Sequence, residues 1–282
     1  MINFSWTAID QVENARIYEA RAQLHQAIQL LTATAISYGQ PKPDDSHTAL
    51  LWESGTNTFV SQPFGPHLSF NISMGVMDLT CRVIHQGESF FEISLHHTTL
   101  QQVASDLKFL LEDHGLPKNE FTMARHFELP DYAERWTRPF DISDRAAFEL
   151  LRATYHNAYP LLRNLVQEDG DKPLPMTWPH HFDMAVLLPR HAGRSIGVGV
   201  SPGDDSYSAP YHYVNVWPYP KPEAVKDKML THGRWHMEGW IGMVLHLEDI
   251  LTTPDPQAQC NMVETFHREA IGHAEDILGE PE

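Results

Sequence analysis

Cysteine, basic residues and long apolar runs are all scarce in this chain of 282 residues. Only two cysteines occur, Cys81 and Cys260, and neither belongs to a Cys-x-x-Cys motif. We therefore expect two reduced, buried thiols rather than a disulfide framework. Lys and Arg total 20 against 37 Asp and Glu, which gives a formal net charge of −17. Because a surface of this sign repels phosphate groups, nucleic acid and anionic membranes are poor partners.

Targeting and nucleotide-binding signals are missing as well. No stretch approaches the ~18 apolar residues that span a bilayer, and residues 1–6 lack the basic region and apolar run of a secretion signal. These absences predict a cytoplasmic protein. There is no Walker A loop, and Gly197 and Gly199 lie inside a predicted strand, which argues against a Rossmann site. Ser201 is not in a Gly-x-Ser-x-Gly elbow, so a serine nucleophile is not indicated either.

The periodicity of the apolar residues predicts the fold class. Helical spacing covers residues 13–38, 98–114, 143–166 and 258–278, and alternation marks strands such as 182–188, 195–200 and 211–217. Most strands follow one another across short turns, without a helix between each pair. This order is typical of an α+β fold with mainly antiparallel sheets and long helices packed against them.

Both halves of the chain have the order helix, strands, helix. This order suggests an internal duplication, with halves 1–116 and 140–282 joined by an irregular segment, 117–139. No low-complexity tract or long linker separates the halves. We therefore expect residues 1–282 to form a single compact unit.

Four segments together resemble a known family. They are Leu24-His25-Gln26-Ala27-Ile28-Gln29, Trp178-Pro179-His180-His181-Phe182-Asp183, the turn Ser201-Pro202-Gly203-Asp204 and the strand Pro210-Tyr211-His212-Tyr213-Val214-Asn215-Val216-Trp217-Pro218. They are similar to DUF5996, a family of bacterial proteins of unknown function, over most of the region between the first and the last segment. Pro179-His180-His181 and Ser201-Pro202-Gly203 depart from the better-known branch of that family. The resemblance implies a divergent branch with a shared fold and pocket, and it implies no activity.

Alternation along three of the strands separates a core face from a second face. Ile196, Val198 and Val200 commit one face to the core, so the other face of that strand carries only serine and glycine. A bare floor between polar and aromatic walls makes room for a ligand, and the same pattern also suits a closely packed helix or a partner protein. The sequence leaves these three interpretations open. In the first, the ligand would contact Trp178, Gly197, Gly199, Ser201, Tyr211, Tyr213, Asn215 and Trp217.

His181 and Asp183 are the residues that we expect to carry chemistry, because they share one face of a strand. His181 would move a proton or bind a divalent metal, and Asp183 would fix the tautomer of His181 or share the metal. A metal would need a third ligand. Secondary candidates for this site are His25, Gln29, His47, His236 and Glu238. Without a metal, Asp183 would orient His181 or cap a backbone amide.

Two classes of function follow. One is a small-molecule-binding protein, with or without enzymatic activity. The other is a non-catalytic interaction or scaffold protein whose aromatic face docks a partner or a second copy in a homo-oligomer. A ligand or ion in a closed concavity favours the first class, and a flat, symmetric apolar contact favours the second.

Overall fold

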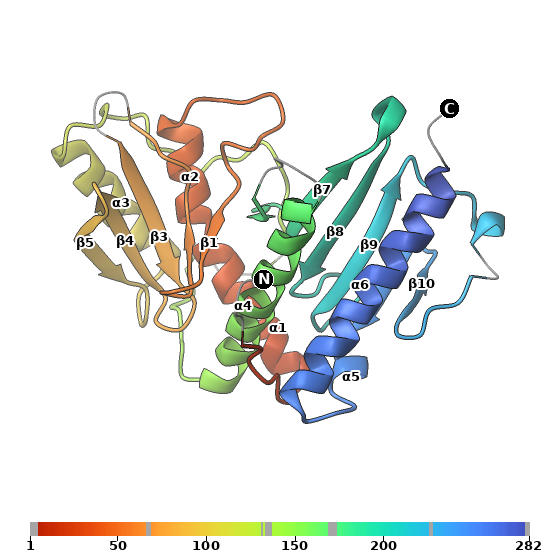
Figure 1. Cartoon of the computed structure of the whole chain (residues 1–282). Coiled ribbons are helices and arrows are strands. Elements are labelled where there is room, and N and C mark those ends of the chain that lie inside the picture. The colour runs from red at the N-terminus through yellow and green to blue at the C-terminus, as the bar shows by residue number, and fades with distance from the viewer. Residues whose placement is uncertain are drawn as a thin grey trace. The chain divides into compact units, whose positions relative to one another are not determined.

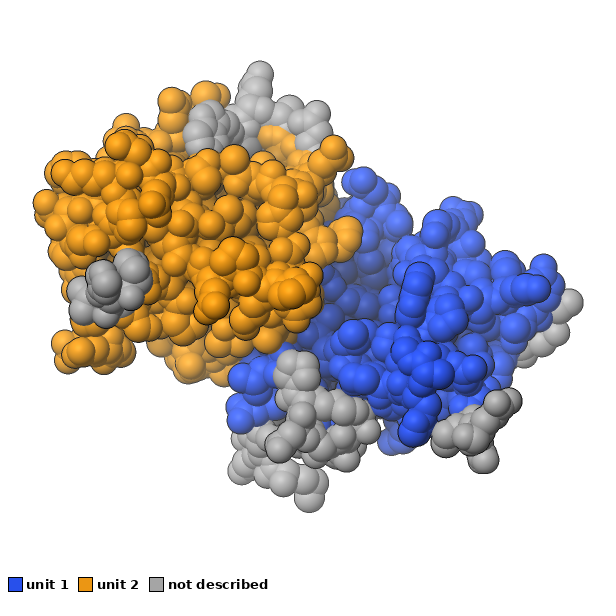
Figure 2. Space-filling model, turned by 90° about the horizontal axis from the view of Figure 1, so that it is seen from above, with its two compact units in different colours: residues 1–14, 153–175, 183–282 blue, residues 15–152, 176–182 orange. Residues whose placement is uncertain are grey.

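The computed structural model describes residues 5–65, 69–130, 132, 137–168, 174–225 and 228–279. The described residues form helices and mainly antiparallel strands, which confirms the predicted α+β class (Figure 1). The chain divides into unit 1, with residues 1–14, 153–175 and 183–282, and unit 2, with residues 15–152 and 176–182; Figure 2 colours them separately. This division differs from the expected halves, because each unit also takes a short segment from the other part of the chain.

Unit 2 is built on an antiparallel sheet in which the strands follow the order of the chain. The strands are β1 (Leu51–Glu53), β2 (Thr58–Val60), β3 (Phe70–Gly75), β4 (Thr80–His85) and β5 (Glu88–Ser94). The helices are α1 (Asn14–Ala27), α2 (Gln29–Tyr38) and α3 (Leu100–Asp113), and α4 (Arg145–Glu168) begins in this unit. The short strand β6 (Met176–Thr177) exchanges two backbone hydrogen bonds with Leu50.

The predicted helix over residues 13–38 is divided in two at Ile28. Helix α2 then runs through the interior, and its first seven residues are all buried. Helix α3 begins where the sequence favours it, because the side chain of Thr99 accepts a hydrogen bond from the backbone N–H of Gln102.

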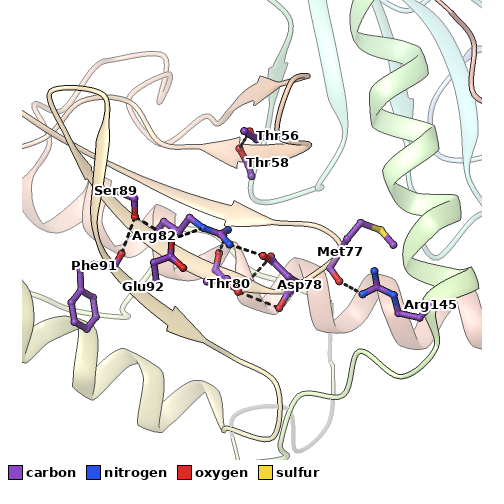
Figure 3. A network of polar contacts seen from close by, with 10 residues as sticks. All are labelled: Thr56, Thr58, Met77, Asp78, Thr80, Arg82, Ser89, Phe91, Glu92 and Arg145. Atoms are coloured by element: carbon purple, nitrogen blue, oxygen red, sulfur yellow. Dashed lines mark hydrogen bonds and ion pairs between the residues drawn. The ribbon is translucent and has the colours of Figure 1, made fainter.

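A polar network holds the turn between β3 and β4 (Figure 3). Arg82 Nη2 lies 2.6 Å from Asp78 Oδ2, and Arg82 Nε lies 3.1 Å from Glu92 Oε1 on β5. The backbone N–H of Thr80 donates to Asp78 Oδ1 at 3.0 Å. Each carboxylate is about half exposed, so the network ties strands together at the surface and adds little stability.

Unit 1 is an antiparallel layer covered by a long helix. Its strands are β7 (Met184–Pro189), β8 (Ser195–Ser201), β9 (Tyr211–Trp217), β10 (Arg234–His236) and β11 (Gly242–His246), arranged in the order β10-β11-β9-β8-β7. The helical segments after residue 190 are the 3-10 turns His191–Gly193 and Pro222–Ala224 and the helices α5 (Leu247–Ile250) and α6 (Pro256–Leu278).

Helix α6 lies along one face of these strands (Figure 1). That face carries Ile196, Val198 and Val200, which are all buried. His212 of β9 meets His267 of α6 on the same face, with ring centroids 5.2 Å apart. The alternation predicted from the sequence is therefore confirmed, and the helix packs on the face opposite the glycines.

Several short elements were missed by the sequence pattern. Strands β2, β6 and β10 have two or three residues each, which is too short to show alternation. In the joining segment 117–139, residues 131 and 133–136 lie outside the described residues, and the rest contains no helix or strand. Both cysteines are free and buried, as predicted, and burial raises the pKa of the Cys81 thiol to about 12. None of the described helices is both long and apolar enough to cross a lipid bilayer.

Candidate functional site

Two of the segments that carry the sequence resemblance meet in unit 2. His25 on α1 and Gln29 on α2 both contact the carbonyl oxygen of Pro179, at 2.8 Å from Nε2 of His25 and 3.0 Å from Nε2 of Gln29. The ring of Phe182 stacks on His25 with centroids 4.9 Å apart. Phe182 has a φ of 60°, a left-handed conformation that a bulky residue rarely adopts, and complete burial of its side chain offsets that strain.

The contacts of His25 determine its tautomer. A carbonyl oxygen can only accept, so Nε2 carries the proton that is shared with Pro179, and Nδ1 accepts the hydroxyl of Tyr132 at 2.7 Å. Burial is the main cause that lowers the pKa of His25 to about 3. This histidine is therefore neutral near pH 7, and it anchors the segment instead of carrying protons.

The other predicted histidines of unit 2 differ in exposure: His47 is buried, His180 is half-buried and His181 is exposed. Burial, and next the neighbouring His181, lower the pKa of the half-buried His180 to about 4, and its ring packs on Trp178 and Phe127. His181 is exposed, with its ring centroid 4.4 Å from that of His180. His47 accepts a hydrogen bond from the backbone N–H of Lys42 at 3.3 Å.

The prediction that His181 and Asp183 share one face of a strand is wrong, because β7 begins at Met184 and Phe182 between them has a φ of 60°, which breaks the alternation of a strand. The two residues also belong to different units. In the described part of the chain, no three His, Cys, Asp or Glu side chains come together in a way that could hold a metal ion. Metal binding by this pair therefore has no third ligand among the described residues. The catalytic roles of His181 and Asp183 stay predictions.

In unit 1, Tyr213 covers the glycine that the sequence presented as a bare floor. Tyr213 on β9 is paired with Gly199 on β8, and a Cβ added to Gly199 would lie 2.6 Å from Cζ and from the hydroxyl oxygen of Tyr213. The hydroxyl donates to Asp183 Oδ2 at 2.5 Å. At Gly199 the floor is neither empty nor covered by a helix, because an aromatic side chain of the neighbouring strand fills the space above it.

The other glycines of this face follow the same rule. Asn215 lies over Gly197, its partner in the β8–β9 register, so that only the flexible end of the amide is close. Gly242 on β11 is covered by Trp240 and by Asn215. Each glycine therefore makes room for a larger neighbour of the protein itself.

A second set of hydrogen bonds lies beside Tyr213. Tyr211 donates to Asp204 Oδ2 at 2.6 Å, and Ser201 Oγ accepts the backbone N–H of Gly203 at 3.1 Å. Tyr207 lies 2.6 Å from Nδ1 of His236, whose Nε2 lies 2.6 Å from the carbonyl oxygen of Glu238. His236 thus has the same arrangement as His25, a tyrosine hydroxyl on Nδ1 and a carbonyl on Nε2. Glu238 takes part through its backbone.

Burial also sets the charge state of these side chains. Burial first, and Asp183 next, raise the pKa of Tyr213 well above its usual value of 10. The pKa of Tyr211 is raised in the same way by burial and then by Asp204. Burial lowers the pKa of His246. The tyrosines are therefore neutral hydrogen-bond donors near pH 7.

At the opposite end of the same face, large apolar side chains are exposed. The Trp217 side chain on β9 is 59% exposed and that of Leu187 on β7 is 56% exposed. Leu187, Gly197 and Asn215 are consecutive partners across β7, β8 and β9, and Trp217 is paired with Ser195 in the next row. We call this face the tyrosine face, and it comprises Ala185, Leu187, Ser195, Gly197, Gly199, Ser201, Tyr211, Tyr213, Asn215 and Trp217, together with Asp183, which accepts the Tyr213 hydroxyl.

Three contributors to this region were not among the predicted site residues. Asp204 and Tyr207 belong to the turn before β9, and Trp240 belongs to the loop before β11. The signal that could have indicated Trp240 is the composition of the segment Gly233-Arg234-Trp235-His236-Met237-Glu238-Gly239-Trp240, which is rich in aromatic and ionisable side chains. No pattern in the sequence indicates that Tyr207 reaches His236, because a turn between two strands has no periodicity.

The similarity to DUF5996 rests on short segments, and the contacts between His25, Gln29 and Pro179 show only that two of them are neighbours. Membership in that family stays a prediction. Comparison of the chain with family models, with curated proteins and with solved structures finds no match.

Proposed function

We propose that this protein binds a small, uncharged, polyhydroxylated ligand, such as a sugar, on the tyrosine face of unit 1. The observation that carries the proposal is the exposure of Trp217 and Leu187, 59% and 56%, on the same face as fixed hydroxyl, amide and carboxylate groups. Exposed large apolar side chains that cluster on one face, next to ordered polar groups, are typical of binding surfaces.

The chemistry of the face matches a polyol. The Trp217 ring offers a flat apolar surface for the C–H groups of a sugar ring. One row further along the sheet, the half-exposed amide of Asn215 supplies both donors and an acceptor for ligand hydroxyls. Because the formal net charge is −17, an anionic ligand such as a phosphate ester is disfavoured.

Binding is proposed rather than catalysis. The Asp183 carboxylate accepts the Tyr213 hydroxyl at 2.5 Å, and the Asp204 carboxylate accepts that of Tyr211 at 2.6 Å. Both carboxylates hold the tyrosines in position. A cytoplasmic location and a homo-oligomeric state remain predictions from the sequence.

Isothermal titration calorimetry of the full chain with maltotriose and with cellotriose tests the proposal. We expect one of the two to bind, and Trp217→Ala to weaken that binding by about 2 kcal/mol, or roughly thirtyfold, because truncation of a central aromatic contact has this cost. Phe109→Ala is the matched control, since Phe109 on α3 in unit 2 is also exposed, at 69%. The absence of binding by both sugars would contradict the proposal.

The same variants test the alternative in which the exposed apolar end docks a second copy. Light scattering after size-exclusion chromatography measures the assembly state. A dimer that Trp217→Ala dissociates and Phe109→Ala leaves intact would favour the interaction protein over the ligand-binding protein.

A further inference from the structure

A second exposed aromatic side chain lies beside Trp217. Tyr219 lies two positions after Trp217, the last residue of β9, and its side chain is 46% exposed. The two rings are in contact, with centroids 5.7 Å apart and an angle of 79° between their planes. Burial is the main cause that raises the pKa of Tyr213, and Tyr219 is among the neighbours that add to it, so Tyr219 is within electrostatic range of the tyrosine face.

The contact between the two rings leaves ring faces open. In an edge-to-face contact one ring presents its edge, and the other ring loses only one of its two faces. Both side chains are about half exposed, so the rest of the protein leaves much of these rings to solvent. A sugar ring stacks on such an aromatic face through its C–H groups. Trp217 and Tyr219 therefore offer two separate stacking surfaces at the apolar end of the tyrosine face.

The backbone that carries these rings is constrained on both sides. Trp217 belongs to the β8–β9 ladder, where it is paired with Ser195. Tyr219 stands between Pro218 and Pro220, and a proline restricts both its own φ and the conformation of the residue before it. The backbone of this segment therefore needs little ordering when a ligand binds, which lowers the entropic cost of binding.

The angle between the ring planes decides which sugar chain can contact both rings. In the β-linked chain of cellotriose, consecutive sugar rings lie nearly in one plane, so the chain is a flat ribbon that stacks on coplanar aromatic rings. In the α-linked chain of maltotriose, consecutive sugar rings are inclined to one another and the chain curves. Two aromatic planes at 79° form a corner. A flat ribbon can stack on one of them, whereas a curved chain can place consecutive units on both.

We propose that Trp217 and Tyr219 together bind consecutive units of an α-linked glucose chain, and that Tyr219 determines the specificity for this linkage. Trp217 stacks on one unit and Tyr219 on the next. This inference rests on the proposed function, which it narrows from a sugar in general to one class of glucose chain. Without Tyr219, a single aromatic surface remains, and such a surface accepts either linkage.

Calorimetry of the full chain with maltotriose and cellotriose, in the native protein and in variants of Tyr219, tests this specificity. We expect the native protein to bind maltotriose at least about tenfold more tightly than cellotriose, because only maltotriose contacts the second ring. Tyr219→Ala should weaken maltotriose binding about tenfold and change cellotriose binding little, so that the preference disappears. Tyr219→Phe keeps the ring and should keep the preference, and Tyr219→Leu, which is apolar without a ring, should lose it.

Tyr18→Ala is the matched control, because Tyr18 on α1 in unit 2 is also exposed, at 42%, and its removal should change neither affinity. Thermal unfolding of each variant shows whether it is folded. Equal binding of the two sugars, or tighter binding of cellotriose, would overturn this inference and leave the proposed function standing. A preference for maltotriose that survives in both Tyr219→Ala and Tyr219→Leu would overturn it as well. Binding of neither sugar would contradict the proposed function itself, and this inference with it.

Discussion

The close fit between Gly199 and Tyr213 predicts that a single added methyl group destabilises unit 1. In Gly199→Ala, the new Cβ would be 2.6 Å from the Tyr213 ring and 2.7 Å from the carbonyl oxygen of Met184. Carbon atoms in contact prefer about 3.5–4.0 Å, so the ring must move by roughly 1 Å. The carbonyl belongs to the backbone of β7, which is paired with β8 and cannot move as freely.

The expected cost follows from three contributions. Overpacking of this kind costs about 1–3 kcal/mol. Displacement of the ring weakens the hydrogen bond from Tyr213 to the Asp183 carboxylate, and hydrogen bonds to charged groups contribute about 1.5–3 kcal/mol. Alanine instead of glycine in a strand recovers about 0.5–1 kcal/mol. We expect a net loss of about 2–3 kcal/mol in the free energy of unfolding.

Urea denaturation followed by tryptophan fluorescence measures this loss. Gly272→Ala is the matched control, because Gly272 is on α6, where an added Cβ meets no atom within 4 Å. The same substitution should there raise stability by up to about 1 kcal/mol, since alanine is the better helix former. In a Tyr213→Ala background, Gly199→Ala should cost less, and the remainder reports the contact with the Met184 carbonyl. If Gly199→Ala were as stable as the native protein, Tyr213 would not cover Gly199, and the face would be an open floor.

Three further predictions concern single side chains. Tyr213→Phe removes the hydroxyl that donates to Asp183, and it should lower the free energy of unfolding by about 1–2 kcal/mol in the same urea assay. Burial lowers the pKa of His267 from 6.5 to about 4, so between these values the unfolded chain binds a proton that the folded chain does not. The contribution of His267 to the free energy of unfolding is therefore fully present above pH 6.5, and it falls by about 1.4 kcal/mol per pH unit between pH 6.5 and about 4. His267→Leu should reduce the difference in unfolding free energy between pH 7 and pH 5 by about 2 kcal/mol. Arg82→Met removes both ion pairs of Arg82 that are drawn in Figure 3. Thermal unfolding should show that the free energy of unfolding falls by only about 1 kcal/mol or less, because the carboxylates are half exposed. A fall of more than about 3 kcal/mol would contradict a peripheral role for this network.

Local alternation was sufficient to predict which side chains of unit 1 face the core. Ile196, Val198 and Val200 are buried because a strand presents every second side chain to the same side, whatever lies there. The antiparallel class followed from short turns between successive strands, since a parallel pair needs a long crossover. These features depend on neighbours within a few residues, and the sequence by itself determined them.

What covers the second face depended on the tertiary structure. The alternation gave the glycines of β8 an orientation, but only the register of β8 against β9 brings Tyr213 over Gly199. A shift of one residue would have put a different side chain there. The choice between a ligand floor and a filled one was therefore a matter of strand pairing, which no local pattern encodes.

The contacts of His25 illustrate the same limit over a longer range. Its partner Pro179 is 154 positions away in the chain, and the hydroxyl of Tyr132 is 107 positions away. The sequence identified His25 and the segment around Pro179 as unusual, but it could not indicate that one holds the other. Their meeting depends on the burial of α1 and α2 in unit 2. Burial lowers the pKa of His25 to about 3, so the neutral ring with both nitrogens hydrogen-bonded is the stable form there.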